Sequence, residues 1–217
     1  MIRGVFVTGT GTEVGKTVVA ALIARTLAGA GTRVAVFKPA VTGLGDPGEP
    51  DHELLRRAAG SEQGDEEIAP YRYGPPASPH LAASLAGEEI DPARLRAAAA
   101  SAAEGADQLV CEGVGGLLVP LAAGYTVRDL AAGLALPLVV AASPGLGTIN
   151  HTLLTLEAAR SAGLEVAMVV LTPWPDVPST VEASNLETIA ALGAVRVETV
   201  PRLDLSDPKR WPPLSSA

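Results

Sequence analysis

A glycine-rich stretch near the N-terminus, residues 8–17, limits the fold of this chain more than any other feature. It reads Thr-Gly-Thr-Gly-Thr-Glu-Val-Gly-Lys-Thr, and it lies between a short apolar run and an alanine-rich apolar run. This order predicts a strand, a tight turn and a helix. The first N–H groups of such a helix have no partner within it and carry the positive end of its dipole. The stretch is therefore a candidate phosphate-binding loop.

The residue types within the loop fit this interpretation. Its glycines let the backbone bend around a polyphosphate and present N–H groups to it. Lys16 would reach the β- and γ-phosphates, and the Thr17 hydroxyl would bind Mg²⁺. The spacing is unusual, because Thr10 stands where the first glycine of the common pattern would be. The alternative is an ordinary strand-to-helix turn in which Gly-Lys-Thr occurs by chance.

Composition narrows the class of protein. The 217 residues suit one domain, and 47% hydrophobic residues with 18% charged ones allow a large core. A net charge of −8 argues against a nucleic-acid or anionic-membrane partner. With Cys111 as the one cysteine, no disulfide framework is expected. The N-terminus has no signal-peptide pattern, and Pro137 and Pro144 break the apolar segment 130–149, so we expect a cytoplasmic enzyme.

Apolar runs alternate with helical patterns along the chain. The predicted strands are 4–8, 33–37, 108–111, 138–142, 166–171 and 195–200, and the predicted helices are 16–28, 52–59, 79–85, 92–103, 127–132, 148–161 and 181–192. Nearly continuous apolar strands indicate a parallel sheet that is covered on both faces. We predict a single-domain, three-layer α/β/α fold over residues 1–217, with a mostly parallel sheet of about seven strands. Residues 204–217 are expected to be a loosely held tail.

Polar residues follow several of these strands directly, and ligands of such sheets bind beyond the carboxyl ends of the strands. Glu112 precedes a glycine cluster and is a candidate metal ligand; it could also be a solvated loop acid. Lys38 ends the second strand and could simply be solvated. Asp51 is either the cap of helix 52–59, a metal ligand, or both. His52 and His80 are expected to be exposed, and no histidine pair has zinc spacing.

The residues at these positions resemble the dethiobiotin synthetase family, over nearly the full length of the chain to about Leu203. The Thr-Glu-Val that precedes Gly15, and the five residues between Gly9 and Gly15, are typical of that family. The other matching segments are Lys38-Pro39, Thr42-Gly43, 111–116, 119–121 and 147–152.

The resemblance implies an activity. The family uses ATP and Mg²⁺ to join 7,8-diaminononanoate and CO₂ into dethiobiotin, with ADP and phosphate as the other products, in biotin biosynthesis. The reaction passes through a carbamate and a carbamic-phosphoric anhydride. The family also acts as a homodimer, in which a helix start of the second subunit holds the far carboxylate of the substrate.

The same resemblance assigns roles to individual residues. The catalytic residues would be Lys38, Lys16 and Thr12. The metal ligands would be Thr17, Asp51 and Glu112, with Asp46 as the open alternative to Asp51. The substrate would contact Thr12, Lys38, Thr42, Gly147, Thr148 and Asn150. The nucleotide would contact Glu13, Val14, Gly15, Lys16, Thr17, Val18, Asp51, Glu112, Gly113, Val114, Gly115, Thr172, Pro201, Arg202 and Leu203.

Two points stay open in the sequence. Family members often carry an Asn-Asp or similar pair that contacts adenine where this chain has Thr172-Pro173, so the choice of nucleotide is undecided. A switch ATPase of the partition or septum-placement type is the alternative function. Those proteins carry a lysine where this chain has Thr10, and they often end in a basic amphipathic helix that is absent here. A cobyric-acid-type amidotransferase would need a glutaminase domain, for which 217 residues leave no room.

Overall fold

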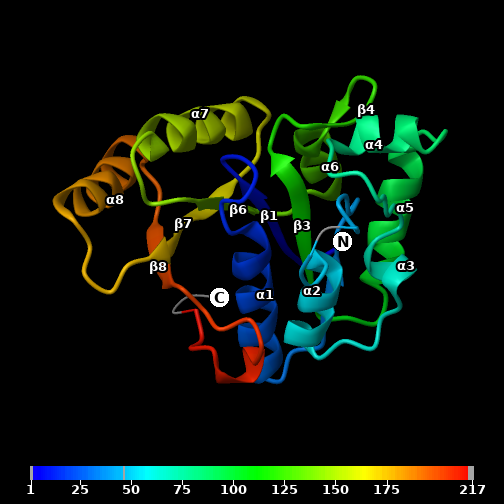
Figure 1. Cartoon of the computed structure of the whole chain (residues 1–217), viewed down its shortest axis with the longest axis horizontal. Coiled ribbons are helices and arrows are strands. Elements are labelled where there is room, and N and C mark those ends of the chain that lie inside the picture. The colour runs from blue at the N-terminus through cyan, green and yellow to red at the C-terminus, as the bar shows by residue number, and fades with distance from the viewer. Residues whose placement is uncertain (1, 46, 215–217) are drawn as a thin grey trace.

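A computed structural model describes residues 2–45 and 47–214 of the chain. Within these residues, six parallel strands form one sheet in the order β2-β3-β1-β6-β7-β8 (Figure 1). The strands are β1 (Gly4–Gly9), β2 (Val34–Phe37), β3 (Gln108–Gly116), β6 (Leu138–Ala142), β7 (Val166–Trp174) and β8 (Val197–Pro201). Two further strands, β4 (Pro120–Ala122) and β5 (Tyr125–Thr126), form a separate antiparallel ribbon.

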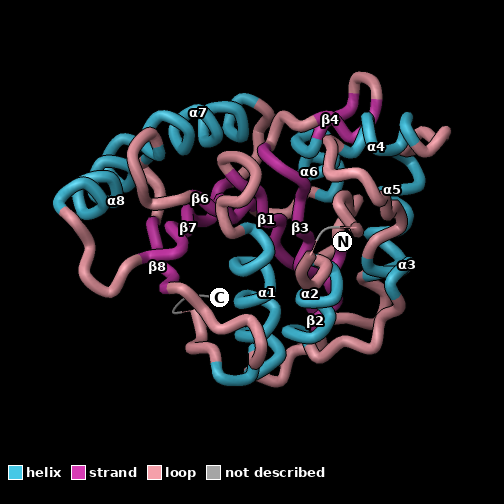
Figure 2. Tube along the Cα trace, viewed as in Figure 1, coloured by secondary structure: helices cyan, strands magenta, loops and turns pink. Residues whose placement is uncertain are grey.

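Helices cover both faces of the sheet, as Figure 2 shows with the strands at the centre. Their bounds are α1 (Lys16–Gly29), α2 (Asp51–Ala59), α3 (Asp65–Ile68), α4 (Pro79–Leu85), α5 (Pro92–Ala102), α6 (Val127–Leu134), α7 (Thr148–Ser161) and α8 (Thr180–Gly193), with a 3₁₀ turn η1 (Pro208–Arg210). The parallel, three-layer prediction is confirmed, with six strands in the main sheet rather than seven. None of the helices in the described part of the chain has the length and hydropathy to cross a membrane.

Side-chain alternation along the strands builds the two layers of core. On β1, Val7 packs in a cluster with α1 and α2, whereas its neighbour Phe6 packs in a cluster with α5 and α6. A third cluster joins β6 and β7 to α7 and α8. This alternation follows from the period of two in a strand, so each apolar strand feeds both faces.

Two strands, β3 and β7, extend well beyond their predicted C-terminal ends. β3 continues past Cys111 to Gly116, because its glycine-rich end still pairs with β1, Gly9 lying opposite Gly116. β7 continues to Trp174, which lies opposite Pro201 of β8. Glu112 is therefore inside a strand, not in the loop after it, and the solvated-loop alternative for Glu112 is wrong.

Two expectations, one about exposure and one about capping, are also wrong. His52 is 2% exposed, whereas His80 is exposed as expected. Asp51 does not cap α2, because Pro50 is the N-cap and Asp51 is the first helical residue. Between α2 and α4 lie the short helix α3 and two buried tyrosines, Tyr71 and Tyr73.

The described part of the C-terminal tail is packed and not loosely held. Trp211 and Leu214 are buried in the cluster that covers α1. The indole N–H of Trp211 donates to the carbonyl of Asp204 at 2.7 Å, and the backbone N–H of Leu214 donates to the Thr26 hydroxyl at 3.0 Å. Residues 215–217 lie outside the described residues.

Candidate active site

The phosphate-binding loop lies between β1 and α1, at the carboxyl edge of the sheet. Gly15 is the N-cap of α1 with φ +84°, and no side chain caps the helix start there. The first N–H groups of α1 are thus available to an anion. Lys16 folds back over the loop, and its ammonium donates to the carbonyl of Gly11 at 2.7 Å.

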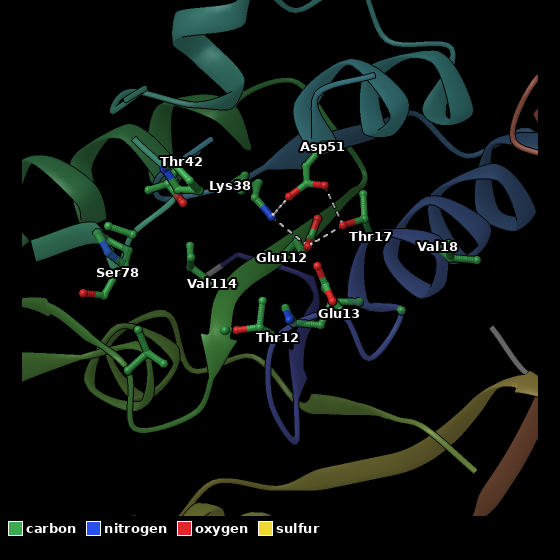
Figure 3. Close-up of a pocket in the computed structure, with 17 residues that line it drawn as sticks. Thr12, Glu13, Thr17, Val18, Lys38, Thr42, Asp51, Ser78, Glu112 and Val114 are labelled. Carbon is green, nitrogen blue, oxygen red and sulfur yellow. Dashed lines mark hydrogen bonds and ion pairs between the residues drawn. The ribbon is translucent and has the colours of Figure 1, made fainter. Parts of the chain in front are cut away.

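A cluster of four side chains lies beside the loop (Figure 3). The Lys38 ammonium lies 2.6 Å from Asp51 Oδ2 and 2.7 Å from Glu112 Oε1. The Thr17 hydroxyl lies 2.9 Å from Asp51 Oδ1 and 2.9 Å from Glu112 Oε1. The cluster joins α1, α2, β3 and the residue after β2, so the topology brings these four positions together.

The charges in this cluster stabilise one another. Burial alone would lower the pKa of the Lys38 ammonium, but the Glu112 and Asp51 carboxylates outweigh it and raise that pKa. Burial would raise the pKa of Asp51, but Lys38 outweighs it and the pKa falls. Burial does raise the pKa of Glu112 against the opposing effect of Lys38. Because the two charged atoms are 2.7 Å apart, we take the Lys38–Glu112 pair as ionised.

The oxygen atoms of this cluster suit a hard divalent cation. A hydroxyl and two carboxylates are the donors that Mg²⁺ prefers, with water and phosphate oxygens completing its shell. Glu112 Oε2 is buried and has no hydrogen-bond partner among the described atoms, which leaves one carboxylate oxygen free for a metal. Among the described residues, no group of three or more His, Cys, Asp or Glu side chains could hold a metal. Asp46, the alternative ligand, lies outside the described residues.

The cluster opens into a cavity of about 690 Å³ that holds most of the predicted site. The predicted residues that line it are Thr12, Glu13, Gly15, Lys16, Thr17, Val18, Lys38, Thr42, Asp51, Glu112, Val114 and Gly115. The sequence prediction missed five lining residues, which are Pro76, Ala77, Ser78, Pro79 and Val119. The sequence signal that could have placed some of these residues is the Ser-Pro pair at the start of α4, since proline favours the first position of a helix.

Several predicted nucleotide residues lie outside this cavity. Thr172 is buried and packs closely against Gly15 of the loop. A Cβ added at Gly15 would lie only 2.5 Å from the Cγ2 of Thr172. Gly113 faces the core, where an added Cβ would lie 2.8 Å from Val127. The predicted nucleotide-binding residues that do not line the cavity are Val14, Gly113, Thr172, Pro201, Arg202 and Leu203.

The predicted substrate residues of α7 also lie outside the cavity. Gly147, with φ +91°, is the N-cap of α7 and no side chain caps it. Asn150 is exposed and Thr148 is buried, and neither lines the cavity within one chain. Within a single chain, the start of α7 therefore does not line the cavity that contains Lys16 and Lys38.

These features define a P-loop nucleotide-binding α/β protein. A family model described as an AAA domain matches residues 3–210. The chain resembles solved structures of the signal recognition particle 54 kDa protein from Aeropyrum pernix in complex with GDP (TM-score 0.57, 16% identity, 96% of this chain and 45% of that one) and of chloroplast FtsY from Physcomitrella patens (TM-score 0.55, 16% identity, 95% and 61%). At such identities, this likeness concerns the fold alone.

Curated relatives identify the family within that class. The chain is 50% identical over 171 residues to the ATP-dependent dethiobiotin synthetase BioD of Anaeromyxobacter dehalogenans, covering 78% of this chain and 76% of that protein. It is 41% identical to the protein of the same name from Rhodococcus erythropolis (87% and 83% covered) and 35% identical to that from Bacillus subtilis (90% and 85%). The chain belongs to the ATP-dependent dethiobiotin synthetase family.

Proposed function

We propose that the whole chain, residues 1–217, acts as a single-domain ATP-dependent dethiobiotin synthetase in biotin biosynthesis. It joins 7,8-diaminononanoate and CO₂ and cleaves ATP to ADP and phosphate. The observation that carries the proposal is that Lys16 and Lys38 line one cavity together with a Mg²⁺-type oxygen set. Its curated relatives carry the synthetase name, so a partition-type switch ATPase is the less supported function.

The chemistry needs three steps. One substrate amine adds to CO₂ and loses a proton, which gives a carbamate. A carbamate oxygen attacks the γ-phosphorus of ATP and releases ADP. The second amine then attacks the carbamate carbon, loses a proton, expels phosphate and closes the cyclic urea. Phosphoryl transfer of this kind depends on positioning and on neutralised charge more than on covalent help from the protein.

The chain's residues supply that positioning. The free N–H groups at the start of α1 would bind the phosphates, and Lys16 would move from Gly11 to the β- and γ-phosphates. Thr17, Asp51 and Glu112 would hold Mg²⁺, which when bound neutralises charge on the phosphate oxygens. The nucleotide base would lie toward Thr172 and the segment 201–203.

Lys38 would serve the carbamate. Its ammonium is buried at the cavity wall, and its raised pKa keeps it charged. A fixed positive charge next to the carbamate stabilises the negative charge that this group carries into phosphoryl transfer. Thr12 and Thr42 line the same cavity and would donate hydrogen bonds to the diamine or the carbamate.

A second copy of the chain would complete the substrate site. Gly147, Thr148 and Asn150 do not line the cavity in one chain, so they would reach the substrate carboxylate across a homodimer interface. The uncapped start of α7 suits a carboxylate. A cytoplasmic location belongs to the same proposal, because the reaction consumes ATP.

The deciding experiment is a product assay. Purified protein is mixed with 7,8-diaminononanoate, bicarbonate, Mg²⁺ and each nucleoside triphosphate in turn, and dethiobiotin is measured by mass spectrometry. The wild type should form it, Lys16→Ala should not, and Lys209→Ala should match the wild type because Lys209 lies outside the cavity. Absence of product from the wild type with every nucleotide, or undiminished product from Lys16→Ala, contradicts the proposal.

Two variants separate the roles of binding and catalysis. Lys38→Ala should lower kcat by about 10²–10⁴, the usual span for acid–base or charge-stabilising groups. A change in KM alone would mean that Lys38 only binds substrate. Asn150→Ala should weaken diamine binding and leave ATP affinity intact, whereas equal loss of both would count against the interface model.

A further inference from the structure

The turn before α7, residues 144–147, is fixed by a side chain of the next helix. Asn185 of α8 is 6% exposed, and its amide Nδ2 donates to the carbonyl of Pro144 at 2.9 Å and to that of Gly145 at 3.2 Å. These partners lie 41 and 40 positions earlier in the chain. The contact therefore depends on the packing of α8 against α7, which Figure 1 shows side by side, and not on local sequence.

Packing alone does not explain an asparagine at this position of α8. The buried residues of the helix are Asn185, Ile189 and Gly193, which share one face because they are four residues apart. That face lies against α7, since Ile189 packs in one cluster with Leu156 and a Cβ added at Gly193 would lie 2.8 Å from the same leucine. A buried amide in such a place costs free energy unless its hydrogen bonds are made. Asn185 donates its hydrogen bonds to the turn, so the turn is the feature that this amide serves.

These hydrogen bonds decide which polar groups the turn offers to an anion. A carbonyl oxygen carries partial negative charge and repels a carboxylate, whereas the free N–H groups of a helix start attract it. Asn185 engages the carbonyls of Pro144 and Gly145 from the buried face of α8. Gly147, with φ +91°, then leads into α7, and no side chain caps the helix there. The turn thus keeps two acceptors occupied and leaves the first N–H groups of α7 for an anion.

We propose that Asn185 is a positioning residue for the carboxylate of the substrate. It fixes residues 144–147 and so holds the start of α7 in the shape that binds this carboxylate, while Asn185 itself does not contact the substrate. The inference rests on the proposed function, because it takes the start of α7 as the carboxylate site that one subunit supplies to its neighbour. It adds a residue of α8, a helix that the proposed function does not otherwise use.

A substrate that lacks the carboxylate tests this role. The ratio kcat/KM is measured with 7,8-diaminononanoate and with 2,3-diaminononane, which has the same carbon chain and a methyl group in place of the carboxylate. Asn185→Ala should lower kcat/KM for the carboxylate substrate by about 5- to 30-fold through KM, the span expected for a carboxylate at a partly buried helix start. It should leave kcat/KM for 2,3-diaminononane and KM for ATP unchanged.

Gln63→Ala is the matched control. The Gln63 amide also binds backbone, because its Oε1 accepts from the N–H of Val36 at 2.8 Å and its Nε2 donates to the carbonyl of Val36 at 3.2 Å, but it does so at the edge strand β2. Gln63→Ala should leave the preference for the carboxylate substrate unchanged. Asn185→Leu, which fills the space without a donor, should behave like Asn185→Ala. Circular dichroism reports whether each variant is folded, and an unfolded fraction would lower kcat/KM for both substrates alike.

The outcomes separate this inference from the proposed function. If the wild type prefers the carboxylate substrate and both Asn185 variants keep that preference, Asn185 does not position the site, and the carboxylate site at α7 still stands. If the wild type uses both substrates equally well, the start of α7 does not bind the carboxylate, and the inference fails with that part of the proposed function. If the wild type converts neither substrate, the proposed function itself fails.

Discussion

The substitution Gly15→Ala tests the geometry of the phosphate-binding loop most directly. Gly15 has φ +84°, a conformation that costs a residue with a side chain about 1–2 kcal/mol. Its new Cβ would also lie 2.5 Å from Thr172 Cγ2, and overpacking of this kind costs about 1–3 kcal/mol. Gly15→Ala should therefore lower the free energy of unfolding by about 2–5 kcal/mol, the sum of the two effects.

Two comparisons separate these contributions in urea unfolding. Gly31 has nearly the same φ, +85°, and an added Cβ there meets nothing within 4 Å, so Gly31→Ala should cost only the backbone part. Thr172→Ser removes the contacting methyl, so adding it to Gly15→Ala should recover about 1–3 kcal/mol. Titration with a fluorescent ATP analogue should show weaker binding for Gly15→Ala. The reasoning is refuted if Gly15→Ala unfolds like Gly31→Ala, or if Thr172→Ser recovers nothing.

Three further predictions test other parts of the structure. Trp211→Ala should lower the free energy of unfolding by about 3–5 kcal/mol, as for other buried tryptophans, and a loss below about 1 kcal/mol would mean that the tail is not packed. The buried amide of Asn185 donates to the carbonyls of the turn before α7. Asn185→Ala should therefore lower the free energy of unfolding by about 1–3 kcal/mol and speed amide hydrogen exchange in that turn. Unchanged exchange would contradict this prediction. Burial, and then Glu88, raises the pKa of Tyr73 to about 12. This pKa lies above the value of about 10 for tyrosine in the unfolded chain. The stabilisation that results should therefore be present below about pH 10 and be lost as the pH rises toward about 12. Absorbance titration of tyrosinate should show a late step that Tyr73→Phe removes.

Local patterns were enough for most of the fold. The inner strands of the main sheet are buried on both faces over most of their length, so they appear in the sequence as apolar runs that need no knowledge of their partners, whereas the edge strand β8 is only partly buried. The extension of β3 to Gly116 has no such signal, because glycine is a poor strand former and only pairing with β1 holds it in place. Long-range pairing thus decides strand ends that local composition cannot.

Burial of polar and tail residues was the weakest part of the sequence prediction. His52 follows the charged start of α2, and nothing local distinguishes a buried histidine from an exposed one there. The tail is rich in Pro and Ser, which suggested weak attachment, yet Trp211 and Leu214 fix it to α1. Two large apolar side chains at the correct spacing outweigh a polar composition, because burial of each contributes about 1.5–3 kcal/mol.

The candidate active site shows a different limit of prediction from sequence. Lys38 and Glu112 could each be selected because strand ends of a parallel sheet meet at one edge, but their pairing across 74 positions of sequence depends on β2 and β3 being neighbours. Asp51 had the appearance of a helix cap, since an acid before a helix is a common cap; its carboxylate instead contacts Lys38 and Thr17. Apolar side chains in place of such buried ion pairs are often neutral or stabilising. Stability alone therefore gives no reason to bury Lys38 and Glu112 beside a phosphate-binding loop, whereas the proposed chemistry needs a fixed positive charge and carboxylate oxygens at that place.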